Sequence, residues 1–361
     1  MIEAIHIQNY RSIVDLELEF GRLNVVSGPN GCGKSNVYHA IQLLSAAANG
    51  QSAQALGEDG GLENVMWSGD SKRDTPKRVI LSCRAQEFEY QLQVGFPPIM
   101  PYPTQFALDA EFKEENIWLP GFHRRPSARV LQRKNQAVFL LDVEGNRQTY
   151  TDTVYDNESV FGQLSDPHLY PEVSKVREIM RGWRFYHDFS VSRHSPLRQA
   201  QHGYRSPVLA SDGTNLAAAF QTIVEIGNVE LMTEILASAF PECHFFCENE
   251  RSRFQVKMQR QGLRRPLLAS EMSDGTLRFL CLTVALLSPR PPSFIALNEP
   301  ENSLHPDMLP ALANLVVEAS RETQIWLTSH SRRLAELIGE RGEFQLHELE
   351  NRQGRTVLVN G

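Results

Sequence analysis

The sequence has no long apolar run, few cysteines and no extended block of charge of one sign. No stretch reaches the roughly 18 uninterrupted apolar residues that a membrane-spanning helix needs. Met1–Tyr10 alternates like an amphipathic strand and does not resemble a signal peptide. The five cysteines are scattered and odd in number, so they form no disulfide framework. These absences predict a cytoplasmic protein with no membrane partner.

The charge balance argues against a general electrostatic attraction to anionic partners. The net charge is −7, so no global basic field draws the chain to nucleic acid or to an anionic membrane. Any contact with DNA would need a local patch. Long heptad runs, internal repeats and low-complexity tracts are absent as well. With 361 residues and a hydrophobic fraction of 41%, the chain can bury a sizeable core without cross-links.

The apolar pattern predicts an α/β fold. Alternation at the start of the chain predicts strands, and a short apolar run before a glycine-rich turn predicts a buried strand followed by a helix. These strands are Ile2–Ile7, Ile13–Phe20 and Leu23–Ser27, and the helix is Lys34–Ala48. The last third alternates helix and strand, which predicts a parallel sheet. Its helices are Leu277–Leu287, Leu309–Ala319 and Arg332–Ile338, and its strands are Phe294–Leu297 and Gln324–Thr328.

The middle of the chain has a different character. Antiparallel strands are predicted over Arg78–Cys83, Phe88–Val94 and Gln105–Phe112, and helical spacing covers Leu216–Ile226. The polar, glycine-rich stretch Gln51–Asp74 is predicted to be a loop. We therefore expect a mixed or parallel central sheet flanked by helices, with an antiparallel β subdomain and an inserted α/β lobe.

The turn between the third strand and the first helix carries a phosphate-binding pattern. Gly28–Ser35 reads GPNGCGKS and fits G-x-x-x-x-G-K-[ST]. The glycines let main-chain N–H groups approach phosphate oxygens, and the helix adds its positive N-terminal end. Lys34 is expected to reach the β- and γ-phosphates and Ser35 to ligate Mg²⁺. The predicted nucleotide-binding residues are Asn30, Gly31, Cys32, Gly33, Lys34, Ser35 and Asn36.

A second pattern follows the strand Phe294–Leu297, where polar residues stand at the carboxyl end of an apolar run. In a parallel sheet that end faces the ligand. Glu299 is the predicted general base for the attacking water. Asn298 occupies the position where this motif usually has aspartate, and its carbonyl oxygen can reach Mg²⁺ only through a bound water and without negative charge. Two readings stay open: a slow ATPase, or a normal enzyme with a tuned metal site.

Two further segments complete the set. Ser270–Thr276, SEMSDGT, opens the helix Leu277–Leu287, where Ser273 is suited to cap the helix and the N-terminal N–H groups form an anion site. His330 follows the strand Gln324–Thr328, in the sequence Thr-Ser-His. It is predicted to contact the γ-phosphate or the attacking water.

In this order the four patterns resemble those of ATP-binding-cassette (ABC) ATPases. The opening IHIQNYRSIVDLELEF with GPNGCGKSN, and NEPENSLHP at Asn298–Pro306, resemble the branch with SMC, RecF-like and OLD-family ATPases, often labelled AAA-type. The resemblance covers about the first 50 and the last 95 residues. It implies a single split ATPase head: 1–155 with the phosphate loop and β subdomain, 156–269 as the inserted lobe, and 270–361 with the remaining motifs.

The resemblance also implies a homodimer closed around two ATP–Mg²⁺. Ser273 and Gly275 of one copy would touch the γ-phosphate held by Lys34 of the other. Asn302–Leu304 would form the D-loop, and Glu299, His330 and Lys34 would be the catalytic residues. A Q-loop glutamine is expected, for which Gln199 is a guess.

The chain has neither the coiled-coil arms of SMC proteins nor the nuclease domain of OLD proteins, so we interpret it as a bare head. The first hypothesis is that ATP binding and hydrolysis gate a separate effector protein or a DNA transaction, in DNA repair and maintenance or in antiviral defence. The alternatives are the ATP-hydrolysing subunit of a membrane transporter and a small-molecule kinase. NEPENSLHP argues against the first of these, and Ser273 with His330 argues against the second.

Weaker features have two readings each. Gly121–Lys134 and Arg251–Arg265 are basic and indicate either phosphate contacts with DNA or solvated strand faces, of which the second is favoured because the total charge is negative. Cys243 and Cys247 have a spacing that suits Zn²⁺ or a buried pair of core residues, and the absence of a second ligand pair favours the core.

Overall fold

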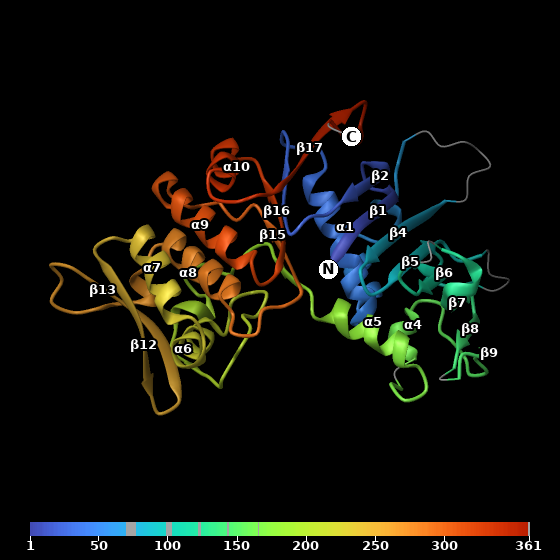
Figure 1. The fold of residues 1–361 in the computed structure, drawn as a ribbon, viewed down its shortest axis with the longest axis horizontal. Helices are drawn as coiled ribbons and strands as arrows, with labels where there is room; N and C mark the ends of the chain where they lie inside the picture. Colours follow the sequence, from blue (N-terminus) through green and yellow to red (C-terminus); the bar gives the residue numbers. More distant parts are fainter. Residues whose placement is uncertain (70–76, 99–102, 122–123, 143, 165, 360–361) are drawn as a thin grey trace. The chain divides into compact units, whose positions relative to one another are not determined.

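The computed structural model describes residues 1–69, 77–98, 103–121, 124–142, 144–164 and 166–359. The chain forms two compact units (Figure 1). The first unit comprises Met1–Gly21, Gly28–Trp183 and His347–Gly361, and the second comprises Arg22–Ser27 and Arg184–Leu346. No helix among the residues described is long and apolar enough to cross a membrane.

The first unit is built on an eight-stranded antiparallel sheet in the order β2-β1-β4-β5-β6-β7-β8-β9 (Figure 1). Period-two alternation buries side chains on one face, as in β1, whose Ile5 and Ile7 are fully buried. The strands are β1 (Ile2–Tyr10), β2 (Ile13–Glu19), β4 (Arg78–Ala85), β5 (Glu89–Gly95), β6 (Glu111–Trp118), β7 (Arg129–Lys134), β8 (Ala137–Leu141) and β9 (Arg147–Thr149).

The helices of the first unit include α1, which follows the phosphate-loop segment. It packs against β1 and against α5, where the Ser45 hydroxyl donates to the Met180 carbonyl over 3.1 Å. The C-terminal hairpin of β17 (Gln345–Arg352) and β18 (Arg355–Leu358) ends the chain. The helices are α1 (Lys34–Ala48), α2 (Ser52–Glu58), α3 (Leu62–Val65), α4 (Val160–Gln163) and α5 (Pro171–Arg181).

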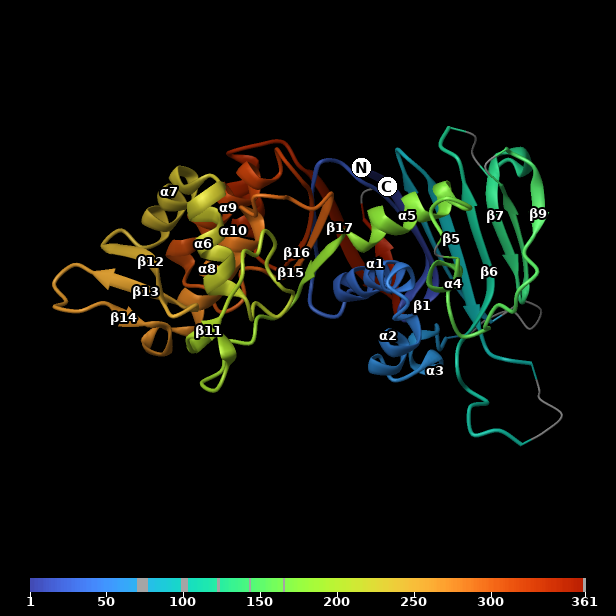
Figure 2. The ribbon, with the colours of Figure 1, turned by 90° about the horizontal axis from the view of Figure 1, so that it is seen from below.

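The second unit has a parallel sheet with buried strands. β10 (Arg184–Tyr186), β15 (Phe294–Asn298), β16 (Gln324–Ser329) and β3 (Leu23–Ser27) pair in that order, all parallel. β15 and β16 are buried along their whole length, which explains their continuous apolar runs. Helices α6 (Leu216–Ile226), α7 (Val229–Ala239), α8 (Asp274–Leu286), α9 (Leu309–Ala319) and α10 (Arg332–Gly339) complete the unit (Figure 2).

Helix α8 lies in the centre of the second unit's core. Ten of its residues are buried, and they pack with α6, α7 and α9 around side chains such as Phe220 and Phe279. A second sheet, in the order β11-β13-β12 with β14 paired to β13, packs against α6 and α7. Its strands are β11 (Gln201–His202), β12 (Cys243–Glu250), β13 (Arg253–Arg260) and β14 (Leu267–Leu268). Short 3₁₀ turns occupy Pro126–Ala128, Pro196–Arg198, Ala269–Glu271 and Pro306–Met308.

The predicted fold class is confirmed, with two local corrections. Gln51–Asp74 was expected to be a loop, but it contains α2 and α3; its residues 70–74 lie outside the described ranges. The strand expected over Gln105–Phe112 begins only at Glu111. Gly95, the last residue of β5, pairs with Glu111, so the pairing of β5 with β6 stops at that residue.

The compact units divide the chain at other points than the lobes predicted at 1–155, 156–269 and 270–361. Arg22–Ser27 belongs to the second unit because β3 pairs with β16, while the segments before and after it belong to the first. The three lobes stay a prediction about functional organisation.

A buried ion pair stabilises the antiparallel sheet of the first unit. Arg133 on β7 and Glu115 on β6 are 3.0 Å apart, and both side chains are 0% exposed. Glu115 also accepts hydrogen bonds from Tyr90, Ser159 and the Val160 N–H, at 2.8, 2.6 and 3.0 Å. Burial, reinforced by the Glu115 charge, raises the pKa of Tyr90 well above its usual value. The pair thereby ties the chain around residue 159 to the sheet.

Replacing Arg133 with methionine is expected to leave the Glu115 carboxylate buried without a cation. We expect the free energy of unfolding to fall by about 3–5 kcal/mol, measured by urea denaturation of the whole chain. The double variant Arg133→Met/Glu115→Gln is the control, and it should recover part of the loss because no buried charge remains. A loss below about 1 kcal/mol in Arg133→Met, the usual value for a solvated ion pair, would contradict this role.

Candidate functional site

The phosphate-loop segment has a backbone that requires glycine at two positions. Gly28 and Gly33 have φ angles of 152° and 105°. A Cβ on Gly28 would lie 2.2 Å from the Leu349 carbonyl oxygen, and one on Gly33 would lie 2.0 Å from the Thr356 hydroxyl. Both contacts involve the C-terminal hairpin, so larger residues would displace the hairpin or open the loop.

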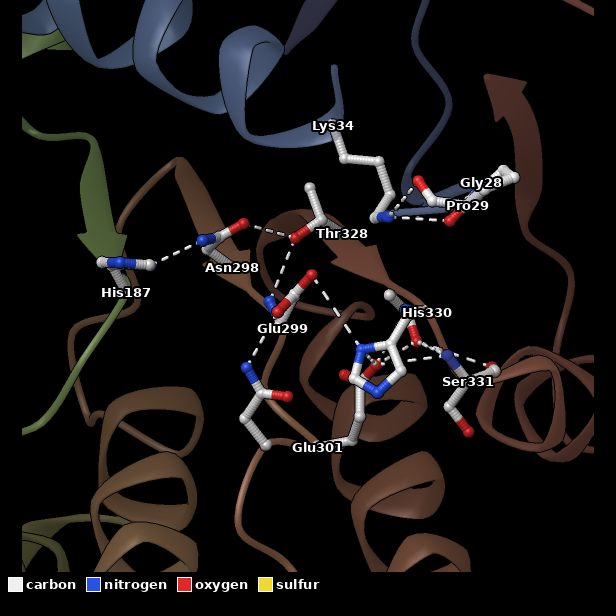
Figure 3. A network of polar contacts seen from close by, with 12 residues as sticks. Gly28, Pro29, Lys34, His187, Asn298, Glu299, Glu301, Thr328, His330 and Ser331 are labelled. Carbon is white, nitrogen blue, oxygen red and sulfur yellow. Dashed lines mark hydrogen bonds and ion pairs between the residues drawn. The ribbon is translucent and has the colours of Figure 1, made fainter. Parts of the chain in front are cut away.

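Lys34, the first residue of α1, points its side chain back into this loop. Its ammonium group donates hydrogen bonds to the carbonyl oxygens of Gly28 and Pro29, over 2.7 and 3.2 Å (Figure 3). Lys34 is 4% exposed. Of the other predicted nucleotide-binding residues in this unit, Cys32 is buried, Gly33 and Asn36 are partly buried, and Asn30, Gly31 and Ser35 are exposed. A cation framed by main-chain groups at a helix N-terminus is suited to bind phosphate.

A chain of hydrogen bonds fixes the same loop from behind. Asn36 donates to the Ser12 hydroxyl over 2.7 Å, and the Ser12 and Thr356 hydroxyls are 2.6 Å apart. Thr356 donates to the Cys32 carbonyl over 2.8 Å. Because the Thr356 hydroxyl has a single hydrogen, Ser12 must donate to it, and the bonds run in one direction from Asn36 to Cys32. The Arg11 guanidinium donates to the side-chain amide oxygen of Asn36 over 3.4 Å and forms an ion pair with Asp59 over 2.6 Å.

The second unit brings Asn298 and Glu299 together at the end of β15. The Asn298 carbonyl oxygen accepts from the Thr328 hydroxyl over 2.6 Å, and its amide nitrogen donates to His187 Nδ1 over 2.5 Å (Figure 3). The Glu299 N–H in turn donates to the Thr328 hydroxyl oxygen over 3.0 Å. The amide of Asn298 is therefore engaged at both ends. His187 was missed in the sequence, because a lone histidine after a short strand carries no motif.

Glu299 has a strained backbone. Its φ of 48° lies in the left-handed region, which costs a non-glycine residue of order 1–3 kcal/mol and is most frequent at functional sites. Its carboxylate accepts from the Asn302 amide over 2.8 Å. The other carboxylate oxygen is 3.9 Å from His330 Nδ1, and the His330 side chain is 48% exposed. Glu299 and His330, predicted separately, thus lie side by side at the ends of neighbouring strands.

The signature segment begins α8. Ser273 is exposed and caps the helix, since its hydroxyl accepts from the Thr276 N–H over 3.1 Å. A Cβ on Gly275 would lie 2.7 Å from the Ser303 carbonyl oxygen, so Gly275 allows the predicted D-loop to approach α8 closely. Arg198 anchors the segment through the Met272 carbonyl, at 2.7 Å, and through Asp274. The adjacent Gln199 is exposed, and its Q-loop role stays a prediction.

The structure shows the surroundings of the weaker sequence features, and the two readings of each stay open. Several bases of the two basic segments have acidic partners: Arg124 with Glu89, Arg133 with Glu115, Lys257 with Glu248, and Arg265 with Glu271. Burial raises the pKa of the Cys243 thiol, and it raises the pKa of the Cys247 thiol to about 11. Both shifts oppose the thiolates that Zn²⁺ needs. In the parts of the chain that the structure describes, no group of three histidine, cysteine or acidic side chains is suited to hold a metal.

The fold is that of a P-loop ATPase head of the ABC class, similar to the heads of SMC proteins. The chain belongs to the family described as "AAA domain, putative AbiEii toxin, Type IV TA system", which matches residues 131–336. Residues 1–94 match the family described as "AAA ATPase domain".

Individual relatives match shorter segments. The chain is 40% identical over 55 residues to the DNA replication and repair protein RecF of Magnetococcus marinus, and 43% identical over 74 residues to the chromosome partition protein Smc of Desulfitobacterium hafniense. These matches cover 15% and 20% of this chain, and 14% and 6% of the relatives. An uncharacterised protein of Methanocaldococcus jannaschii is 43% identical over 51 residues, 14% of this chain and 23% of that protein.

Solved structures resemble nearly the whole chain. An SMC head bound to the C-winged helix domain of ScpA aligns with a TM-score of 0.57 and 14% identity, covering 99% of this chain and 97% of that chain. An SMC head with an extended coiled coil, bound to the C-terminal domain of ScpA from Pyrococcus furiosus, aligns with a TM-score of 0.53 and 14% identity, covering 99% and 95%. At this identity the likeness supports the fold alone.

Removing the Thr356 hydroxyl is expected to weaken nucleotide binding. Thr356→Val keeps the shape but takes the donor from the Cys32 carbonyl, and a lost hydrogen bond of about 1.4 kcal/mol corresponds to about a tenfold higher Kd for ATP. Titration with a fluorescent ATP analogue measures this. Thr356→Ser retains the hydroxyl and should bind within about twofold of the wild type. Equal affinity of Thr356→Val and the wild type would argue against the hydrogen-bond chain.

Introducing aspartate at position 298 distinguishes the two readings of Asn298. Asn298→Asp adds a negative charge next to the proposed metal position, so the Mg²⁺ concentration for half-maximal ATP turnover should fall. Magnesium titration of steady-state turnover measures this. A concurrent rise in kcat would indicate that Asn298 slows the enzyme, whereas an unchanged kcat would indicate a tuned metal site. An unchanged magnesium requirement would remove Asn298 from the metal site.

Proposed function

We propose that this chain binds and hydrolyses ATP as a homodimer closed around two ATP–Mg²⁺. The observation that supports the proposal is the register of the parallel strands at their carboxyl ends. Asn298 of β15 is opposite Thr328 of β16, and Ser329 of β16 is opposite Ser27 of β3. The phosphate loop starts at the next residue, Gly28. The loop, the Glu299 base and His330 therefore all begin at the carboxyl ends of neighbouring parallel strands, where ligands of α/β sheets bind.

Each residue has a role that suits its chemistry. The loop N–H groups and Lys34 would hold the β- and γ-phosphates, and Glu299 would accept a hydrogen bond from the attacking water. His330 would contact the γ-phosphate. Mg²⁺ would be held by the Ser35 hydroxyl and, through a water, by the Asn298 carbonyl; it would neutralise phosphate charge. Two neutral oxygen ligands fit a metal that retains several of its waters.

The exposed start of α8 supports the proposed dimer. Ser273 and the N–H groups of the first helical turn would be suited to bind an anion. We propose that Ser273 and Gly275 contact the γ-phosphate bound to Lys34 of the second copy. Asn302–Leu304, which approach Gly275 through Ser303, would then form the D-loop between the two sites.

The ATP cycle is proposed to gate a separate effector protein or a DNA transaction, in DNA maintenance or in defence against foreign DNA. The relatives named for chromosome partition and for DNA replication and repair support a DNA-related task. The family description, which names a toxin of a toxin–antitoxin system, supports the defence alternative.

ATP turnover of the purified chain, with and without duplex DNA, tests the proposal. We expect Lys34→Ala and Glu299→Gln each to reduce kcat by at least about 100-fold. Lys34→Ala should also lose ATP affinity, because the ammonium contacts the phosphates, whereas Glu299→Gln should keep affinity and accumulate as an ATP-dependent dimer in analytical ultracentrifugation.

Glu336→Gln is the matched control, since Glu336 is exposed on α10 and pairs only with the surface residue Arg333 in the contacts of its carboxylate that the structure describes. It should retain wild-type turnover. Stimulation by DNA would support a DNA transaction. A wild-type chain that neither binds nor hydrolyses ATP would refute the proposal.

A further inference from the structure

Glu301 is a buried carboxylate beside the proposed catalytic residues, and the sequence patterns assigned it no role. It lies two residues after Glu299, and its side chain is 4% exposed. One of its oxygens, Oε1, accepts three hydrogen bonds from three consecutive residues at the end of β16. The donors are the Ser329 hydroxyl at 2.5 Å, the His330 N–H at 3.0 Å and the Ser331 N–H at 3.3 Å.

These three bonds fix the turn that carries His330. Main-chain N–H groups that converge on one carboxylate oxygen hold the backbone more tightly than neutral hydrogen bonds do, because the acceptor is charged. The Ser331 hydroxyl then caps α10 by accepting from the Leu334 N–H over 3.2 Å. Glu301 therefore holds the backbone just after β16, and with it the direction in which the His330 side chain projects.

The imidazole of His330 lies between two carboxylates. Its Nδ1 is 3.4 Å from Glu301 Oε1 and 3.9 Å from Glu299 Oε1 (Figure 3). The second oxygen of Glu301, Oε2, is buried and has no hydrogen-bond partner among the residues that the structure describes. A buried carboxylate oxygen without a partner is unfavourable, so the three hydrogen bonds to this turn alone do not explain why a carboxylate is used here.

We infer that Glu301 is a positioning residue that orients His330 toward Glu299. The inference rests on the proposed ATP turnover, in which both of these residues take part. Glu301 also connects His330 to the predicted D-loop, since the Leu304 N–H donates to the Glu301 carbonyl over 3.1 Å. If a second copy bound to Asn302–Leu304, a movement of that segment would therefore be transmitted to His330 through Glu301.

Steady-state kinetics of Glu301→Ala and Glu301→Gln test the inference. Alanine removes the acceptor for all three donors, so kcat should fall by about 10- to 100-fold, the usual loss for residues that orient a catalytic group. KM should change by less than about threefold, because Glu301 would not contact the nucleotide. Glutamine keeps a carbonyl oxygen at the same reach and should restore kcat to within about fivefold of the wild type.

Glu336→Gln on α10 is again the control, for loss of a carboxylate away from the site. A role confined to stability would lower the folded fraction of Glu301→Ala but leave kcat per folded molecule unchanged, and that result would overturn the inference. If the wild type hydrolyses ATP and Glu301→Ala matches it, the inference fails while the proposed function stands.

Histidine-ring NMR provides a readout that does not depend on turnover or on the alanine variant. The His330 signal is identified by its loss in His330→Gln. In Glu301→Gln this signal should move, because a negative charge 3.4 Å from Nδ1 has been removed. An unmoved signal would overturn the inference even if the wild type proved inactive.

Discussion

The parallel pairing of β3 with β16 is the constraint on which the rest of the site depends. It places Ser27 opposite Ser329, so that one end of the phosphate loop is fixed by a main-chain ladder. The other end of the loop continues into α1, and the hydroxyl of Thr356 holds its middle through the Cys32 carbonyl. A loop fixed in this way at three places is pre-organised for phosphate, because its N–H groups need no further ordering when the ligand arrives.

The two carboxylates after β15 show how one short segment can serve two purposes. Glu299 has a left-handed backbone and a partly exposed side chain, which suits the role of general base proposed for it. Glu301 is buried and accepts hydrogen bonds from the His330 and Ser331 N–H groups, just after β16. The proline between them prevents the segment from continuing as a strand or a helix, so the two side chains can lie in different surroundings.

The sequence predicted the elements whose pattern is local and failed where the deciding contact is distant. Helix Lys34–Ala48 was predicted to the residue, because a glycine turn starts it and apolar residues recur with helical spacing. The order of the four motifs identified the fold. In contrast, the bond from Thr356 to Cys32 joins residues 324 positions apart, and the contact of His187 with Asn298 spans 111. No periodicity in a single sequence records such pairs. The short helices after residue 51 were missed because their composition is that of a loop.

The same contact gives a physical account of the asparagine at the end of β15. An amide can accept from Thr328 and donate to His187 Nδ1 at the same time, whereas an aspartate can only accept. With aspartate, His187 would have to carry its proton on Nδ1, or two acceptors would face each other across 2.5 Å. Asparagine thus suits a histidine whose Nδ1 carries no proton, and the residue at position 298 fits its neighbours as well as the proposed metal. On this account Asn298 belongs to a neutral hydrogen-bonded set, and negative charge in this half of the site is left to Glu299 and Glu301.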